Sequence, residues 1–461
     1  MKGFPLMLAA MGLSTAAVAM PAAQDRVYTA DQNSNTVSVI DPTSNTLLGQ
    51  IQLGNPRPDV LSPLYKGQVN VHGLGFSPDH KTLIAISTVT NSAAFIDTAT
   101  NTVKGIAYVG RNPHEGFFTP DGKEAWIVVR GEDYLAVIDP VTFKEKTRIK
   151  TTSGPGMVIF SKDGKRAFLA NSFNPVVEVI DVAQRKVIKK ITVVSPFSPF
   201  IQITPDGKEV WSTHKDVGKV TRIDTTTLEV KGVIDTGFIT NHLAFARSGG
   251  RTLAYVTVGG ENAVKIFTTD AAAQLVKTVP VGALPHGIWA SGDGSRVYVG
   301  LENGDAVDVI DTASNDVVAH VPIGQAPQAL VYVPDAVAQG DGRANLVPRP
   351  QSPPSVNIAL KPASGNERGF VVARNLGLVD MLETNVFGLK PDTIYRVFLE
   401  GHDAPVAALK TNAKGMGTVA AIGPLRDIGA GAKQGGDAKT GILVVEGDGA
   451  PSPAAAVLTG R

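Results

Sequence analysis

The chain has no cysteine among its 461 residues. This absence excludes disulfides, thiolate metal sites, thioether-linked haem and a lipid-modified cysteine anchor. The charges are almost balanced, with 43 lysines and arginines against 42 aspartates and glutamates, and no block of one sign occurs. Because binding to a nucleic-acid backbone requires clustered cations, we expect no nucleic-acid partner.

Long hydrophobic runs are also scarce. Residues 1–19 carry Lys2, an apolar stretch and then Ala17, Val18 and Ala19. This order is typical of a secretory signal peptide with a small-x-small cleavage site, and the stretch is too short to span a membrane. We therefore expect a periplasmic or secreted protein without a membrane span.

One sequence repeat, by contrast, recurs throughout most of the chain. A β-rich run, an aspartate, a turn rich in Thr and Asn and a further strand appear seven times within residues 27–324. Two clear copies are VYTADQNSNTVSVIDPTSNTLLGQIQLG at residues 27–54 and VYVGLENGDAVDVIDTASNDVVAHVPIG at residues 297–324. A period of about 40 to 45 residues with four short strands is typical of propeller blades. The predicted fold class is all-β, a seven-bladed β-propeller.

A second marker sets the register of the blades. It is the apolar residue that ends the strand before each turn of the Ser-Pro-Asp-Gly type, and it recurs at spacings of 42 to 45 residues as Phe76, Phe118, Phe160, Ile203, Phe245, Ala290 and Tyr332. The first three-strand repeat is not preceded by an inner strand, which is the strand that ends in an apolar marker. The last inner strand, residues 328–333, is not followed by a three-strand repeat. We predict that these two halves complete one blade and close the ring, which removes open sheet edges.

The repeat resembles that of the YVTN-family β-propellers. The best matches are NTVSVIDPTSNTL at residues 35–47 and IDTATNTVKGIAYVG at residues 96–110. The resemblance covers about residues 27–335 and implies a propeller domain, which we assign to residues 24–335. It implies no single function, because relatives include surface-layer proteins, periplasmic binding proteins, lyases, lactonases and metal or haem scaffolds.

Two further regions follow the repeats. Residues 336–355 are polar and rich in proline, as in a semi-rigid linker. Residues 356–461 contain short β-like runs between glycine-rich turns, which predicts a small Ig-like β-sandwich. Within it, LKPDTIYRV at residues 389–397 resembles the tyrosine corner of fibronectin type III domains, where the Tyr395 hydroxyl would bond to upstream backbone.

The start of each inner strand should line the mouth of the propeller channel. Four positions before the apolar markers, the chain has His72, His114, Gly156, Pro199, Asn241, His286 and Gln328. In a closed ring, the three histidines and Gln328 fall on one continuous arc of neighbouring blades. These three imidazoles could coordinate one Cu, Zn or Fe ion and leave a position for water or substrate.

Other residues could assist such a site. His242 is one residue out of register, which could turn it away from the channel, and His214 is expected in a loop between the second and third strands. Glu115 could hydrogen-bond a ligand imidazole or act as a base. The alternative is that all these histidines only hydrogen-bond backbone and water.

A polar collar on the same face could bind a small anionic or sugar-like ligand. Its members are Arg111, Arg130, Glu132, Asn171, Asn241, Asn262 and Glu302. The loop of residues 54–71 is about fourteen residues longer than its counterparts and is either a partial lid or a surface insertion. The recurring aspartates are predicted to be structural, because a carboxylate at a strand end can accept turn N–H groups; they are Asp41, Asp97, Asp139, Asp181, Asp224 and Asp311.

Three functions are compatible with these features. The first, which asks least of the sequence, is an exported, non-catalytic scaffold that binds a small ligand, a metal ion or a periplasmic protein partner at the channel mouth. The second is a metal-assisted hydrolase, lyase or oxidoreductase accessory that uses the three histidines around a bound water. The third, implied by the resemblance alone, is a structural protein of the cell envelope or surface layer.

Overall fold

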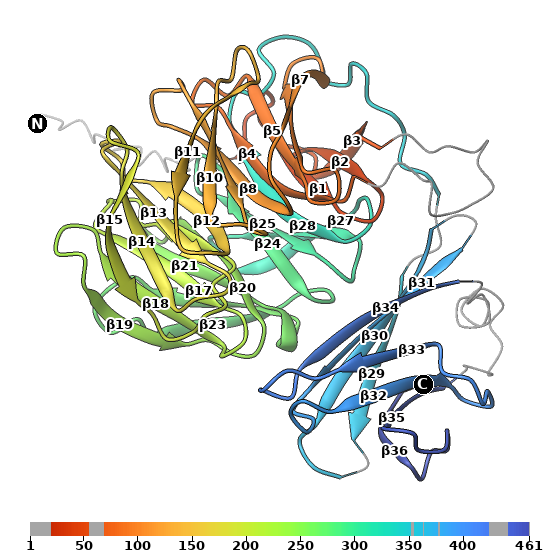
Figure 1. Cartoon of the computed structure of the whole chain (residues 1–461). Helices are drawn as coiled ribbons and strands as arrows, with labels where there is room; N and C mark the ends of the chain where they lie inside the picture. Colours follow the sequence, from red (N-terminus) through yellow and green to blue (C-terminus); the bar gives the residue numbers. More distant parts are fainter. Residues whose placement is uncertain are drawn as a thin grey trace, which may run out of the picture.

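The computed structural model describes residues 20–54, 69–351, 355–362, 364–376, 379–423 and 441–460. Seven four-stranded sheets form the blades of a propeller, and an eight-stranded sheet forms the C-terminal domain (Figure 1). The predicted signal segment and most of the long loop before His72 lie outside the described residues. Within the described ranges no helix is long and apolar enough to cross a membrane. The all-β prediction with seven blades is confirmed.

Each blade places its strands in order from the channel outward. Blade 1 is β28 (Pro327–Val333), β1 (Arg26–Asp31), β2 (Thr36–Asp41) and β3 (Thr46–Gln52). Blade 2 is β4 (Val71–Phe76), β5 (Thr82–Ser87), β6 (Ser92–Asp97) and β7 (Thr102–Tyr108). Blade 3 is β8 (Pro113–Phe118), β9 (Ala125–Val129), β10 (Tyr134–Ile138) and β11 (Glu145–Lys150). Blade 4 is β12 (Pro155–Phe160), β13 (Arg166–Asn171), β14 (Val176–Asp181) and β15 (Lys186–Thr192).

The remaining blades repeat this order. Blade 5 is β16 (Ile201–Ile203), β17 (Glu209–His214), β18 (Lys219–Asp224) and β19 (Val230–Asp235). Blade 6 is β20 (Thr240–Ser248), β21 (Arg251–Val258), β22 (Ala263–Thr268) and β23 (Leu275–Pro280), with the short 3-10 helix η2 (Gly259–Glu261) between β21 and β22. Blade 7 is β24 (Pro285–Ala290), β25 (Arg296–Leu301), β26 (Ala306–Asp311) and β27 (Asp316–Pro322).

The ring closes as predicted, by pairing the last propeller strand with the first. Strand β28 runs antiparallel to β1, with Tyr28 opposite Val331. Asp25 reinforces the closure, since it accepts hydrogen bonds from the Tyr332 hydroxyl and, at 2.8 Å, from the backbone N–H of Asp335. Closure therefore depends on side chains as well as on the strand ladder.

The propeller core lies between neighbouring blades. Inner and middle strands are buried on both faces, whereas the outermost strands are mostly exposed. The apolar markers pack against aromatic rings of the adjacent blade, as in the pairs Trp126–Phe160 and Trp211–Phe245, with ring centroids 5.0 and 5.3 Å apart. Edge-to-face aromatic pairs of this kind add to the burial energy.

The repeated aspartates have the structural role that was predicted. Asp41 accepts the N–H of Thr43 at 2.9 Å, and Asp311 accepts those of Ala313 and Ser314 at 2.9 and 3.0 Å. Equivalent bonds are made by Asp97, Asp139, Asp181 and Asp224. These carboxylates fix the outer turns and are not available for chemistry.

The C-terminal domain is one curled sheet with the strand order β33-β32-β35-β36-β29-β30-β31-β34. Its strands are β29 (Val356–Pro362), β30 (Arg368–Asn375), β31 (Asp380–Phe387), β32 (Ile394–Leu399), β33 (Ala407–Lys410), β34 (Gly417–Gly423), β35 (Ile442–Glu446) and β36 (Ala456–Gly460). Contacts between the two edge strands, β33 and β34, nearly close the sheet into a barrel. The Tyr395 hydroxyl accepts the N–H of Lys390 at 3.1 Å, as the tyrosine-corner motif predicted.

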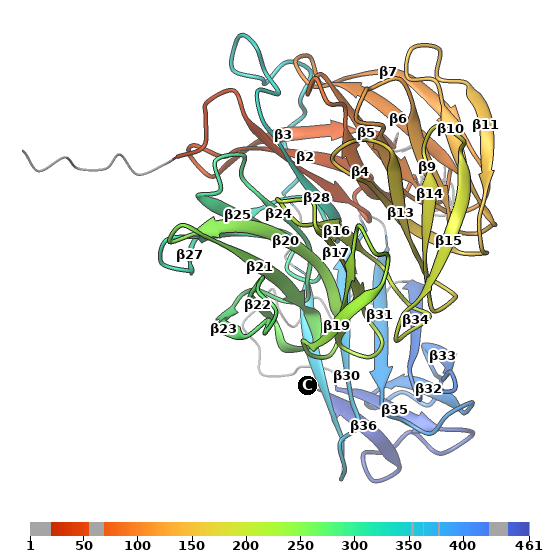
Figure 2. The same cartoon turned by 90° about the vertical axis from the view of Figure 1, so that its left-hand side faces the viewer.

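The segment between the domains packs against the propeller. Val347 forms an isolated bridge with Gln50, and the side-chain amide of Asn101 donates to the carbonyls of Gly342 and Ala344, both at 2.9 Å. Beyond it, β30, β31 and β34 point toward the propeller (Figure 2). The ends of these three strands therefore face the propeller, and Asn357 of β29 donates to the carbonyl of Asn303 at 2.7 Å.

Candidate functional site

β-bulges at the start of the inner strands position the residues of the channel mouth. The strand ladders skip residues between Val71 and Leu74 in β4, between Pro113 and Gly116 in β8, and in the same place in β12, β20 and β24. A bulge releases residues from the ladder and redirects their side chains. His72, His114, His242 and His286 all lie within these bulges.

His72 and His114 form one pair of rings, with centroids 4.3 Å apart. Nδ1 of His114 donates to the carbonyl of Gly156 at 2.8 Å, so in the neutral ring Nε2 carries the lone pair. Nδ1 of His72 lies 3.4 Å from Oε1 of Gln32. Burial, followed by the charge of Arg130, holds the pKa of both imidazoles well below the usual range. Both rings are therefore neutral near pH 7.

His242 and His286 form a second pair, with ring centroids 4.7 Å apart. His242 also stacks on Phe200 at 4.1 Å. The expectation that His242 turns away from the channel histidines is wrong, because the bulge in β20 breaks the simple alternation on which it was based. Burial lowers the pKa of His242 to about 3, with a smaller contribution from Lys215.

His214 is a structural residue. It ends strand β17 and does not lie in a loop, contrary to the sequence-based expectation. Its Nδ1 lies 3.0 Å from the Ser198 hydroxyl and its Nε2 lies 2.7 Å from the Thr221 hydroxyl. Both ring nitrogens are therefore engaged, and burial lowers the pKa of His214 to about 4.

The three-histidine metal centre remains a prediction. Within the described ranges, no group of three or more His, Asp or Glu side chains is arranged to hold a metal ion. The structure instead pairs His72 with His114 and His286 with His242.

His286 lies beside an acidic residue of the same blade. Its Nδ1 is 3.5 Å from Oε2 of Glu302, and neither atom has a hydrogen-bond partner among the described residues. Burial raises the pKa of Glu302, partly offset by Lys215 and by a hydrogen bond from Gln328. Burial lowers that of His286. Glu302 and Gln328, which the sequence analysis assigned to the collar and to the histidine arc, therefore lie close to each other.

Glu115 is enclosed between blades 2 and 3. A side chain at position 73 would bring its Cβ to 2.6 Å from Oε2 of Glu115 and 2.1 Å from the carbonyl of His114, so only glycine fits there. Burial raises the pKa of Glu115 well above the usual range, although the N–H of Leu74 and the charge of Arg130 oppose this. Glu115 is therefore an enclosed carboxyl group whose ionisation is opposed by burial.

The polar collar divides into channel and surface residues. Arg130 is half-buried, and burial lowers its pKa to about 10 while Glu115 opposes the shift. The amide of Asn241 donates to the carbonyl of Pro285 at 2.8 Å. Arg111 is exposed and lies 3.7 Å from Glu132, while Asn171 and Asn262 bond to nearby backbone. Arg130, Asn241 and Glu302 are therefore the collar members that can reach a channel ligand.

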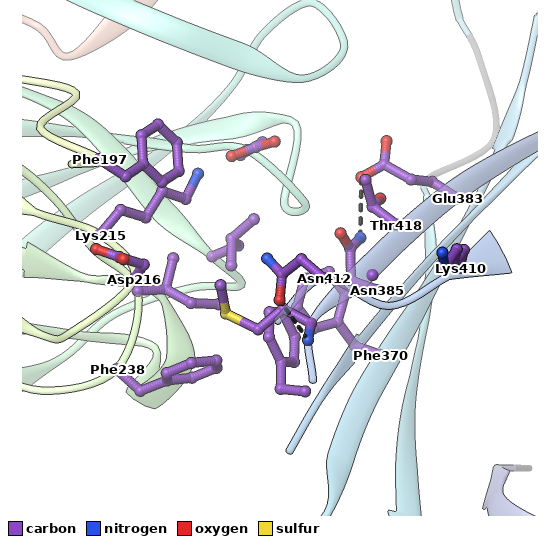
Figure 3. Close-up of a pocket in the computed structure, with 16 residues that line it drawn as sticks. Phe197, Lys215, Asp216, Phe238, Phe370, Glu383, Asn385, Lys410, Asn412 and Thr418 are labelled. Carbon is purple, nitrogen blue, oxygen red and sulfur yellow. Dashed lines mark hydrogen bonds between the residues drawn. The ribbon is translucent and has the colours of Figure 1, made fainter. Parts of the chain in front are cut away.

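A cavity of about 440 Å³ lies between the propeller face and the C-terminal domain (Figure 3). The propeller contributes Phe197, Lys215, Asp216, Phe238, Ile239, Leu284 and Glu302. The C-terminal domain contributes Phe370, Glu383, Asn385, Phe387, Lys410, Asn412, Met416, Gly417 and Thr418. Glu302 belongs both to the cavity wall and to the pair with His286, so the cavity lies next to the channel histidines.

Specific contacts hold the two domains together around this cavity. Arg374 donates to the carbonyl of Glu302 at 2.6 Å and to Oδ1 of Asn303 at 3.0 Å. On another side, Lys414 pairs with Asp216. The ring of Phe238 meets that of Phe387 edge to face, with centroids 4.5 Å apart. The C-terminal domain therefore covers the mouth over blades 5 to 7.

Residues 79–314 match the family model described as "Domain of unknown function (DUF5074)", which is about half of the chain. The chain belongs to this family. The match begins in blade 2 and ends in blade 7, so it covers most of the propeller of this DUF5074 protein. No curated protein matches the sequence.

Several solved structures are similar to this DUF5074 protein. Hydrazine synthase from Kuenenia stuttgartiensis has a TM-score of 0.52 and 22% identity, over 57% of this chain and 89% of that one. A functionally unknown protein from Desulfotomaculum acetoxidans DSM 771 has a TM-score of 0.57 and 15% identity, over 67% and 98%. The dihydro-heme d1 dehydrogenase NirN in complex with DHE has a TM-score of 0.50 and 12% identity, over 87% and 76%. At these identities the likeness shows the propeller fold alone.

Sequence reasoning missed Lys215 and the whole C-terminal wall of the cavity. Lys215 lies in the short turn after β17 and has the appearance of an ordinary surface lysine in the sequence. The signal in the sequence was that Lys215 directly follows His214, at the end of the second strand of its blade. Such a position lies on the channel face of the propeller. No motif indicates how the C-terminal domain docks.

Proposed function

We propose that this protein is an exported binding protein that holds a small ligand at the channel mouth, beneath the C-terminal domain. One observation carries the proposal: a cavity of about 440 Å³ between the domains is lined by Glu302, and Glu302 belongs to a group of channel-mouth residues with buried polar atoms that have no partner among the described residues. These include Nδ1 of His286, Oε2 of Glu302 and Oδ1 of Asn241. Small-molecule sites typically combine such a volume, apolar walls and a few convergent polar groups.

Export is supported by the sequence of residues 1–19, with Lys2, an apolar stretch and a small-x-small site. The YVTN-type repeat fits the same proposal, because that resemblance implies propellers that include periplasmic binding proteins. Recovery of a shortened protein beginning near Met20 in a periplasmic fraction is the expected result.

The similar structures support the proposed binding function by analogy. NirN is described as a complex with DHE, so a chain with this general fold can hold an organic ligand. Hydrazine synthase and the dehydrogenase NirN are both named as enzymes. The analogy concerns the fold and does not transfer a substrate.

A metal-assisted enzyme is the second candidate. The bond from Nδ1 of His114 to the carbonyl of Gly156 favours it, because backbone carbonyls commonly orient metal-binding imidazoles in this way. Elemental analysis of protein purified from its native compartment tests it. About one equivalent of Cu, Zn or Fe, lost when His72, His114 and His286 are changed to alanine, would support this function over the first.

The binding proposal is tested by identifying compounds that copurify with the native protein. Thr418 is exposed on β34 and lines the cavity, so Thr418→Trp should fill it. Ile422→Trp places the same ring on the same face of β34, outside the cavity. We expect mass spectrometry to find a compound with wild type and Ile422→Trp that is absent from Thr418→Trp. Equal recovery from all three proteins would contradict the proposal.

A further inference from the structure

Two cationic side chains, Arg130 and Lys215, act electrostatically on the histidines at the channel mouth. Arg130 follows β9 on blade 3, and Lys215 lies in the turn between β17 and β18 on blade 5. Among the described residues, neither side chain forms an ion pair, whereas most other half-buried cations do, such as Lys265 with Glu261 and Arg296 with Asp311. Nε of Arg130 is also buried, and no described residue forms a hydrogen bond with it. Unpaired charge of this kind is costly unless an anion compensates it.

Both cations act on the same group of imidazoles. After burial, the charges of Arg130 and Lys215 both lower the pKa of His72. Arg130 also acts on His114, and Lys215 on His286. The two cations therefore approach one shared volume from different blades.

Two acids lie within electrostatic reach of these cations, Glu115 of Arg130 and Glu302 of Lys215. Burial raises the pKa of Glu115 well above the usual range, although the charge of Arg130 opposes this. Burial likewise raises the pKa of Glu302, although the charge of Lys215 opposes it. Burial thus opposes the ionisation of both carboxyl groups, whereas a bound anion would bring compensating charge to the two cations.

We infer that the ligand is an organic anion whose acidic group binds to Arg130 and Lys215 beside His72 and whose apolar part occupies the cavity. This inference rests on the proposed function. A guanidinium offers parallel N–H donors to a carboxylate or phosphate, and neutral imidazoles supply further donors. Phe197, next to Lys215, and Phe370 on the opposite wall form apolar surfaces for the rest of the molecule (Figure 3).

Calorimetric titration with simple probes tests the inference. Benzoate and inorganic phosphate serve as anions and benzamide as the neutral counterpart of benzoate, all at constant ionic strength. We expect the wild-type protein to bind at least one of the two anions. Benzamide should bind more weakly than benzoate, by about tenfold or more. Arg130→Gln should weaken anion binding by about tenfold or more. Arg111→Gln removes an exposed arginine from the same face and should leave the affinity for the anion unchanged.

Three results would overturn the inference: equal affinity for benzoate and benzamide, no binding of either anion, or unchanged anion affinity in Arg130→Gln. If Arg130→Gln does not fold, as judged by its thermal unfolding, Lys215→Gln in the turn provides the same comparison. A neutral or cationic compound that copurifies with wild type and is lost from Thr418→Trp would support the proposed binding function. It would contradict only the inference that the ligand is an anion.

Discussion

Nδ1 of His286 lies 3.5 Å from Oε2 of Glu302, and Glu302 also lines the interdomain cavity. Burial lowers the pKa of the imidazole and raises that of the carboxyl group. Burial therefore opposes charge on both members of the pair. The cations Arg130 and Lys215 act electrostatically on the histidines of the same region.

Docking of the C-terminal domain should depend on Arg374, whose side chain is 1% exposed. Arg374→Met would leave the carbonyl of Glu302 and Oδ1 of Asn303 without this donor, at a cost of about 3 kcal/mol. Calorimetry should show separate unfolding of the two domains, with faster proteolysis of residues 336–355. Arg368→Met removes an exposed arginine above the Phe238 ring and should cost less than about 1 kcal/mol. Equal losses in the two variants would contradict this role.

Glu209 should stabilise blade 5 in a pH-dependent way. It accepts bonds from Arg222 at 2.9 and 3.0 Å and from the indole of Trp211 at 2.9 Å. Burial opposes ionisation, but these partners and Lys231 hold the pKa of Glu209 below the usual range. Glu209→Gln leaves Arg222 buried and unpaired, so we expect a loss of about 3 kcal/mol at pH 7 in chemical denaturation.

The difference between wild type and Glu209→Gln should shrink as the pH falls. A depressed pKa stabilises the fold above the unfolded value of 4.5, and this stabilisation is lost as the pH falls through the folded value. Glu132→Gln, at a surface pair with Arg111, serves as the control and should change stability little. A difference that stays constant down to pH 3 would contradict the assignment.

Asp31 should give the opposite pH dependence. Burial raises its pKa to about 7, although hydroxyl groups of Ser38, Thr29 and Thr36 oppose the shift. Between roughly pH 4 and pH 7 the unfolded chain releases this proton while the folded chain keeps it, so stability falls as the pH rises, by up to about 1.4 kcal/mol per unit. Asp31→Asn should flatten the free energy of unfolding over this range, whereas Asp41→Asn, at an exposed turn, should not.

Tyr395 should stabilise the C-terminal domain through its hydroxyl group. Tyr395→Phe removes the acceptor for the N–H of Lys390 while keeping the buried ring, so we expect a loss of about 1 kcal/mol in chemical denaturation. Tyr108→Phe, at a residue that is 73% exposed, should have no measurable effect. Equal stability of Tyr395→Phe and wild type would show that the ring alone matters.

The parts of the structure that were predicted depend on local signals. The strands, the closure of the ring and the turn aspartates follow from alternation, spacing and the preference of Asp for turns. The side-chain partners of the site were harder to predict. A bulge placed His242 beside His286, and two hydroxyl groups from blade 5 engaged both nitrogens of His214. Such details depend on backbone irregularities that leave little trace in hydrophobic periodicity.

The seven blades could be read from the sequence, because six of them are encoded by contiguous segments and the two chain ends of the repeat region complete the seventh. The cover that the C-terminal domain forms over blades 5 to 7, and the cavity between them, could not be read from it. That arrangement depends on contacts between distant residues, such as Lys414 with Asp216 and Arg374 with Asn303. No local pattern specifies them, because each side chain by itself is compatible with an ordinary solvated surface.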